Sequence, residues 1–199
     1  MERTVSLDIE IEAKMRLTDL PGVEARLGDV GARHRGEVLE TNTYFDTVNQ
    51  DLKSSDRGLR IRVEINPTGT REVTITHKGP RAHGKLKSRS ESEVRVDDAR
   101  QAAELLTAMG YRPVLTFEKR RRRWELDGCT VVLDTLPHLG DFIEIEGPDD
   151  QAVLEVRDKL GLGQTPIIKA SYIAMMVTYL SEQHLETNMI CFETSASPG

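Results

Sequence analysis

Residues 7–17 read Leu-Asp-Ile-Glu-Ile-Glu-Ala-Lys-Met-Arg-Leu, a stretch in which apolar and charged side chains alternate with a period of two. Because successive side chains of a β-strand point to opposite faces, Glu10, Glu12 and Lys14 share one face and the isoleucines share the other. Like charges on one face repel each other, so they need a counter-ion or an opposing partner. The stretch predicts a strand with one apolar face and one charged face.

Similar alternation, or an enrichment in β-branched residues, recurs along most of the chain. Turn residues separate these segments, and Asp127-Gly128 is typical of a tight hairpin. Strands are expected at 6–17, 36–45, 58–65, 71–78, 85–96, 115–126, 130–136 and 141–146. Helical periodicity predicts helices at 20–30, 97–109, 149–160 and 171–180.

Charged faces occur on several of the expected strands, and two interpretations are open for each of them. A single charged face is most often a solvated sheet surface. Exposed strands, however, favour Thr and mixed polar residues over repeated Glu-x-Glu and Arg-x-Arg pairs, which favours an interior location for the set as a whole. Beyond the first strand, the charged faces are Arg60 and Arg62; Lys85, Lys87, Arg89, Glu91 and Glu93; Lys119, Arg121 and Arg123; Asp134; and Glu144 and Glu146.

An interior location for these faces predicts an α+β fold, an antiparallel β-barrel with a charged lumen and helices packed outside. Carboxylates are hard oxygen ligands for Mg²⁺ or Mn²⁺, and Lys and Arg bind phosphate. A polyphosphate with bound divalent metal satisfies both sets of charges. Four helices hide only part of the outer apolar surface, so a homodimer is a further hypothesis.

Composition limits the binding partners and the cellular compartment that we expect for the protein. The net charge of -6 over 199 residues argues against a nucleic-acid partner. No run approaches the ~20 apolar residues that span a bilayer, so no membrane partner is expected. Cys129 and Cys191 are far apart and lack CxxC spacing, which favours a reduced, cytoplasmic setting. We expect one domain at 1–183 and a flexible tail at 184–199.

Several short motifs follow one another in an order that resembles a known family. Glu10-Ile11-Glu12-Ala13-Lys14 is an ExExK pattern, and Thr-Tyr-Phe-Asp at 43–46 and Leu-Arg-Ile-Arg at 59–62 come after it. A Lys-Gly-Pro turn at 78–80 and Leu-Gly-Asp-Phe-Ile-Glu-Ile-Glu at 139–146 complete the series. The series resembles the CYTH superfamily, the triphosphate tunnel metalloenzymes, and within it the class IV adenylate cyclase branch of the CyaB type. One departure is His77, which stands where that branch is expected to have Tyr.

The resemblance implies an eight-stranded antiparallel tunnel with helices outside, and a set of site residues. The implied metal ligands, for two Mg²⁺ or Mn²⁺ ions per site, are Glu10, Glu12, Glu144 and Glu146, joined by Asp134. The implied phosphate ligands are Lys14, Arg60, Arg62, Lys78, Lys87, Lys119 and Arg121. Among these, Lys14, Lys119 and Arg121 are the expected catalytic residues.

Three functions remain open at the level of the sequence. The resemblance favours a metal-dependent adenylate cyclase that converts ATP to 3′,5′-cyclic AMP and pyrophosphate. The alternative is a metal-dependent triphosphatase acting on thiamine triphosphate or inorganic triphosphate. The third is a non-catalytic module that binds polyphosphate or nucleotide, against which the full set of carboxylates argues, because phosphate binding alone needs cations more than metal ligands.

Overall fold

The computed structural model of the chain describes residues 8–82 and 86–193, without the side chains of residues 8–10 and 87. Eight antiparallel strands pair in the order β2-β3-β4-β5-β1-β8-β7-β6, and β6 pairs back with β2 to close the sheet. The expected antiparallel barrel is therefore confirmed. The strands are β1 Asp8–Leu17, β2 Arg33–Asp46, β3 Gly58–Ile65, β4 Arg71–Arg81, β5 Lys87–Val96, β6 Arg112–Leu126, β7 Cys129–Leu136 and β8 Gly140–Gly147.

Four of the helices lie where the sequence predicts them, and each begins next to a side chain that caps it. Asp19, Asp98 and Asp149 accept hydrogen bonds from backbone N–H groups of the first turn, and Ser171 does the same through its hydroxyl. No described helix is long and apolar enough to cross a membrane. The helices are α1 Leu20–Asp29, α3 Ala99–Ala108, α4 Asp150–Lys159 and α5 Tyr172–Glu182.

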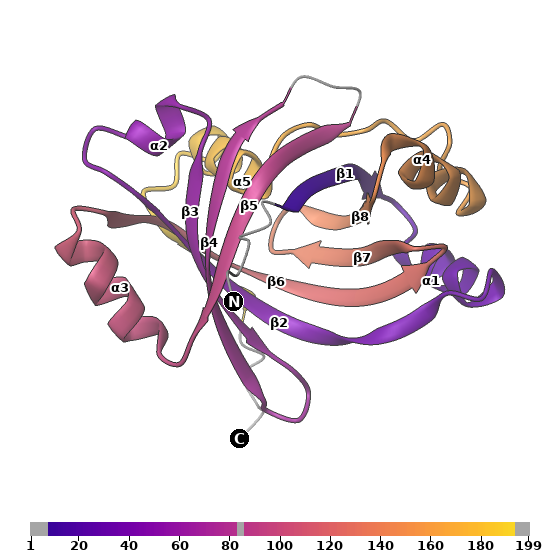
Figure 1. Ribbon diagram of the computed structural model, residues 1–199, viewed down its shortest axis with the longest axis horizontal. Helices are drawn as coiled ribbons and strands as arrows, with labels where there is room; N and C mark the ends of the chain where they lie inside the picture. Colours follow the sequence, from indigo (N-terminus) through magenta and orange to yellow (C-terminus); the bar gives the residue numbers. More distant parts are fainter. Residues whose placement is uncertain (1–7, 83–85, 194–199) are drawn as a thin grey trace, which may run out of the picture.

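The largest apolar core lies outside the barrel wall, between the strands and the helices. Ala13 and Met15 of β1 and Ile145 of β8 pack with Leu27 of α1 and Val153 of α4. Figure 1 shows α1 and α4 together on one side of the barrel and α3 on the opposite side. A second cluster joins α3 to β3 and β4. The apolar faces of the strands therefore look outward, as the alternation predicts, and the helices cover them.

One end of the barrel has an apolar interior instead of a charged one. Leu115 and Phe117 are on the same face of β6 as Lys119, and they pack with Phe142 of β8. Tyr172 and Met176 of α5 complete this cluster. Helix α5 is thus attached to the barrel at the end where its lining changes from charged to apolar.

Two elements differ from the sequence expectation. A short helix, α2 Asp51–Ser54, lies between β2 and β3. In the segment expected to be a flexible tail, β9 Met189–Ile190 pairs in parallel with Thr116 and Phe117 of β6. Ile190 is buried in the cluster around α5. Within this segment, Met189 and Ile190 therefore pair with the barrel, while residues 184–189 have exposed side chains.

The outer core yields a stability prediction from two matched substitutions. Ile145→Ala removes a fully buried side chain between β8 and the helices, and we expect it to lower the free energy of unfolding by about 2–5 kcal/mol. Ile65→Ala, at an exposed strand end, is the control and should change it by less than about 0.5 kcal/mol. Urea denaturation measures both. Equal effects would contradict an apolar core outside the barrel.

Candidate functional site

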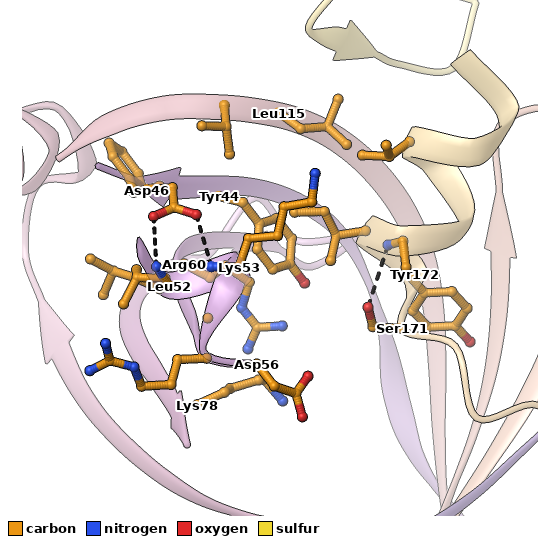
Figure 2. A pocket seen from close by; sticks show the side chains of 18 of the residues that line it. Tyr44, Asp46, Leu52, Lys53, Asp56, Arg60, Lys78, Leu115, Ser171 and Tyr172 are labelled. Carbon is orange, nitrogen blue, oxygen red and sulfur yellow. Dashed lines mark hydrogen bonds between the residues drawn. The ribbon is translucent and has the colours of Figure 1, made fainter. Parts of the chain in front are cut away.

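A cavity of about 540 Å³ opens inside the barrel next to α2 and α5. Its lining comes from strands on all sides of the barrel and from both helices. Figure 2 shows Tyr44, Arg60 and Lys78 around this space, with Tyr172 at the start of α5 beside them. The predicted phosphate ligands Lys14, Arg60, Arg62, Lys78, Lys119 and Arg121 all line the cavity, and we call this set the cationic cradle.

Two of the predicted site residues cannot be placed. Glu10 lies opposite Arg89 in the register of β1 and β5, and Lys87 lies opposite Glu12. Their side chains are outside the described residues. Their roles as metal and phosphate ligands stay predictions.

Asp134 of β7 is a fully buried carboxylate that holds part of the cradle in place. Arg121 donates to it through Nε and Nη2, at 2.7 and 2.6 Å, and Lys119 donates through Nζ at 3.2 Å. The hydroxyl of Tyr172 donates to Oδ2 at 3.0 Å. These contacts make Asp134 a counter-ion for two cations, and its role as a metal ligand stays a prediction.

Glu40 of β2 is a second fully buried carboxylate, and the sequence interpretation missed it. It forms ion pairs with Arg62 at 3.3 Å, Lys119 at 3.2 Å and Arg121 at 3.5 Å. Burial alone would raise the pKa of Glu40, but these cations outweigh it and hold that pKa well below its ordinary value. Glu40 lies among mixed polar residues of β2, and no repeated charge shares its face, so the sequence pattern does not single it out.

A further layer of ion pairs lies next to the cradle, outside the lining of the cavity. Arg123 donates to Glu64 at 2.5 Å and to Glu40 at 3.5 Å, while Arg62 contacts Glu64 at 3.4 Å. Neither Arg123 nor Glu64 lines the cavity. The carboxylates of β2 and β3 thus connect the cradle to the next layer of the lumen.

Lys119 is positioned between the two buried acids. Burial lowers its pKa, and the nearby Arg121 lowers it further, while Asp134 and Glu40 act in the opposite direction. Its ammonium also lies 5.1 Å from the centre of the Tyr172 ring, and that of Lys14 lies 3.6 Å from it. Tyr172 therefore contacts the cradle through both its ring and its hydroxyl.

The remaining predicted metal ligands lie on the neighbouring strands β1 and β8. Glu12 is opposite Glu146, and Lys14 is opposite Glu144. Glu12 is buried, Glu144 is half-buried and Glu146 is exposed. Glu144 accepts from Arg121 at 2.7 Å and contacts Lys14 at 3.2 Å. Adjacent hard oxygen donors at one place in the wall fit Mg²⁺ or Mn²⁺ in chemical type.

The described carboxylates do not by themselves converge on a metal site. Within residues 8–82 and 86–193, no three His, Cys, Asp or Glu side chains are close enough together to hold an ion. Glu144 is instead held by Lys14 and Arg121. A cation bound there would therefore lie beside Lys14 and Arg121, which already contact the two oxygens of Glu144.

Tyr44 of β2 lies directly opposite Arg60 of β3 and lines the cavity. Burial acts to raise the pKa of its hydroxyl, but Arg60, Lys78 and Arg62 together lower it. The Nε atom of Arg60 is buried and has no hydrogen-bond partner among the described residues. A buried donor without a partner, in a lining rich in cations, fits an anionic ligand.

Asp46, the last residue of the Thr-Tyr-Phe-Asp motif, positions the short helix α2. Its carboxylate accepts from the backbone N–H groups of Leu52 at 2.9 Å and Lys53 at 3.0 Å, as Figure 2 shows. His77, the departure from the family pattern, is exposed and lies between Thr76 and Lys78 on the opposite face of β4. It does not line the cavity.

Comparisons with known proteins agree with this geometry. The CYTH domain family matches residues 8–172. The chain is 33% identical over 192 residues to a protein named adenylate cyclase CyaB from Aeromonas hydrophila, covering 90% of this chain and 92% of that one. A solved structure from Pyrococcus horikoshii is similar with a TM-score of 0.73 and 27% identity, over 85% of this chain and 99% of that one.

A plant protein has the same fold. The structure from Hippeastrum, described as a putative adenylyl cyclase that reveals a dominant triphosphatase activity, is similar with a TM-score of 0.68. It covers 85% of this chain and 96% of that one, at 18% identity. At this identity the likeness shows the shared fold alone.

The buried acids yield a prediction about stability and pH. Because the pKa of Glu40 is lowered on folding, its ionised form stabilises the protein above the unfolded-state pKa of 4.5, and this contribution falls as the pH drops below that value. We expect Glu40→Gln to reduce the free energy of unfolding at pH 7 by about 3–5 kcal/mol and to flatten its decline in acid.

Urea denaturation between pH 3 and pH 7 measures both effects. Glu37→Gln is the matched control, because Glu37 is exposed on the same strand. An acid decline of unchanged steepness in Glu40→Gln would show that Glu40 does not hold the cations.

Proposed function

This chain belongs to the CYTH domain family, and we propose that it is a metal-dependent adenylate cyclase that converts ATP to 3′,5′-cyclic AMP and pyrophosphate inside the barrel. The observation that carries the proposal is the cationic cradle, which gathers buried Lys and Arg side chains from separate strands around one cavity. A relative at 33% identity over most of both chains is named adenylate cyclase, which supports this activity over others.

The cradle is suited to the triphosphate of the substrate. Arg60 offers a buried Nε without a described partner, and Arg121 and Lys119 are oriented by Asp134. Charge-assisted hydrogen bonds of this kind are stronger than neutral ones, and a site that excludes water strengthens them further. Because Asp134 and Glu40 fix the cations in advance, little reorganisation is needed when phosphate enters.

The family implies a dependence on a divalent metal ion. The carboxylate oxygens on β1 and β8 are of the chemical type that binds such an ion. Glu12, Glu144 and Glu146, together with Glu10 and with Asp134 as the further predicted ligand, would hold Mg²⁺ or Mn²⁺, two ions in the proposed enzyme. When bound, the metal would supply Lewis-acid polarisation of phosphate oxygens and acidify the attacking hydroxyl.

The chain's own residues account for the rest of the reaction. The ribose 3′-oxygen forms a bond to the α-phosphorus, and the bond from that phosphorus to the bridging oxygen of pyrophosphate breaks. Lys14, Lys119 and Arg121 stabilise the charge that moves onto the leaving pyrophosphate. We propose Tyr44, which lines the cavity and whose hydroxyl pKa is lowered by nearby cations, as the acceptor of the 3′-hydroxyl proton.

Triphosphate hydrolysis is the second candidate, because the cradle binds the same chemical group in either reaction. The Hippeastrum protein with this fold is described as having a dominant triphosphatase activity. In that reaction water attacks the terminal phosphorus, the bond from that phosphorus to the bridging oxygen breaks, the diphosphate leaves, and orthophosphate is formed. The organic part of the substrate then takes no part in the chemistry.

Product identification separates these functions. The protein is incubated with Mg²⁺ or Mn²⁺ and either ATP or tripolyphosphate, and the products are resolved by chromatography and phosphorus NMR. We expect cyclic AMP and pyrophosphate from ATP. Orthophosphate without cyclic AMP would assign the chain to the triphosphatases, and tight binding without any product would assign it to non-catalytic binding modules.

A substitution at β1 tests the proposed metal ligands. We expect Glu12→Gln to lower turnover by more than about 100-fold, because loss of even an outer partner of a metal ligand costs 10–100-fold. Excess Mn²⁺ should restore part of the loss, and circular dichroism should show the barrel intact. Glu104→Gln, exposed on α3, is the control. A Glu12→Gln enzyme with normal metal dependence would refute this assignment.

The pH profile tests the role of Tyr44. A proton acceptor works in its ionised form, so activity should rise as the pH rises through the pKa of Tyr44, which lies below its ordinary value of 10.0. Tyr44→Phe should remove this rise while the dissociation constant for substrate changes little. Tyr111→Phe, outside the cavity, should keep it. A rise that persists in Tyr44→Phe would exclude Tyr44 as the acceptor.

A further inference from the structure

Tyr172, the first residue of α5, places an aromatic ring among the charges of the cradle. Its side chain is buried and lines the cavity. The ammonium of Lys14, on β1, lies 3.6 Å from the centre of the ring, and the ammonium of Lys119, on β6, lies 5.1 Å from it. Both distances are within the range in which the face of a ring attracts a positive charge. One ring therefore contacts two ammoniums that come from different strands.

The ring of Tyr172 is itself held by the surrounding side chains. Its hydroxyl donates a hydrogen bond to Oδ2 of Asp134 at 3.0 Å. Phe142 packs against it, with the ring centres 5.4 Å apart and the ring planes at 74°. Met176, about one helical turn further along α5, belongs to the same buried cluster. A ring packed in this way has little freedom to turn its face away from the ammoniums.

The backbone that leads into α5 is attached to the strand that carries Lys14. The N–H of Ile168 donates to the carbonyl of Lys14 at 2.7 Å, and Nζ of Lys14 donates to the carbonyl of Ala170 at 3.2 Å. Ser171 then caps the helix that begins at Tyr172. The position of Tyr172 relative to Lys14 is therefore set by the main chain as well as by side chains.

A lysine in the cradle needs a positioning contact more than an arginine does. The guanidinium of Arg121 is a rigid planar fork, and it donates to Asp134 through two nitrogen atoms, at 2.7 and 2.6 Å. The ammonium of Lys14 is a point charge at the end of a flexible stem, and it contacts Glu144 through its single nitrogen atom at 3.2 Å. Such a contact defines no plane, so the ring face adds a constraint on where the ammonium lies.

From these contacts we propose that Tyr172 is a positioning residue, whose ring face holds the ammoniums of Lys14 and Lys119 in place for the transition state. The inference rests on the proposed function, in which these two lysines stabilise the charge that moves onto pyrophosphate. Cations that are fixed in advance need no reorganisation as that charge develops. The ring performs this role, and the hydroxyl orients the ring.

Loss of the ring should affect turnover more than substrate binding. Both lysines remain in such a variant, and the cavity is still lined by Arg60, Arg62, Lys78 and Arg121, so the triphosphate still meets cations when it binds. The negative charge on the leaving group grows as the reaction proceeds, so misplaced ammoniums matter most in the transition state. An interaction made mainly in the transition state contributes to kcat and leaves KM nearly unchanged.

Steady-state kinetics of the whole protein with ATP and Mn²⁺ test this role. We expect Tyr172→Leu, which removes the ring, to lower kcat about 30-fold and to change KM by less than about threefold. Tyr172→Phe keeps the ring and loses one hydrogen bond, so its kcat should stay within about fivefold of wild type. Tyr179→Leu is the control on the same helix, because Tyr179 stacks on His138 and is not among the described residues that line the cavity. Its kcat should stay within about twofold of wild type.

A fluorinated ring tests the same role without a change of shape. Replacing Tyr172 with a trifluorinated phenylalanine keeps the packing of the ring but removes most of the negative charge from its face, so kcat should fall about tenfold below that of Tyr172→Phe. Circular dichroism should show the same fold for both proteins. This comparison remains informative even if Tyr172→Leu fails to fold. Equal kcat values for the two rings would refute an electrostatic role of the ring face.

A double-mutant cycle tests whether Tyr172 acts through Lys14. In a Lys14→Met background one of the two ammoniums is absent, so Tyr172→Leu should lower kcat by only about fivefold. A general structural effect of Tyr172→Leu would instead lower kcat by the same factor in both backgrounds, and that result would overturn the inference.

The outcomes separate this inference from the proposed function. If wild type forms cyclic AMP but Tyr172→Leu matches it, changes KM alone, or loses no more activity than Tyr172→Phe, the positioning role is refuted and the cyclase activity stands. If wild type forms no cyclic AMP from ATP, both proposals are overturned.

Discussion

Two buried carboxylates make the interior of this barrel possible. Lys and Arg side chains that gather in a closed lumen repel one another and lose their hydration, which is costly without counter-ions. Glu40 and Asp134 are fully buried and supply those counter-ions from β2 and β7. Lys119 of β6 contacts both of them, so one ammonium links the two strands that flank β6.

The charged interior also determines the architecture around it. A strand with one charged and one apolar face presents them to opposite sides of the sheet, so a barrel that turns its charges inward must place its apolar core outside. The helices α1, α3 and α4 form that core with the outer faces of the strands. The wall of the barrel is then stabilised on both faces, because ion pairs form inside it and apolar side chains pack outside it.

Much of this arrangement follows from the period of two, and the rest depends on contacts that leave no such pattern. The period places Glu12 with Lys14, and Arg60 with Arg62, on one face whatever the strand order, so these pairings were predictable from the sequence. Glu40 and Tyr44 of β2 belong to no repeated charge pattern. Their electrostatic roles come from the cations of β3 and β6 that surround them. Tyr172 belongs to an apolar helix, and only its position at the barrel end brings it to Asp134. Helix α2 is four residues long and depends on Asp46, which precedes it in another element.

The pairing of strand β9 with β6 affects what a C-terminal truncation would expose. On one side, β6 pairs with β7 only from Arg120 onward, so among the described residues β9 alone pairs with the first half of β6 on that side. The backbone N–H of Thr116 donates to the carbonyl of Asn188 at 2.8 Å. A chain shortened before residue 188 would leave this half of β6 as a bare sheet edge, the kind of surface through which proteins associate strand to strand. We therefore expect loss of the C-terminal segment to promote association between copies of the chain through this edge.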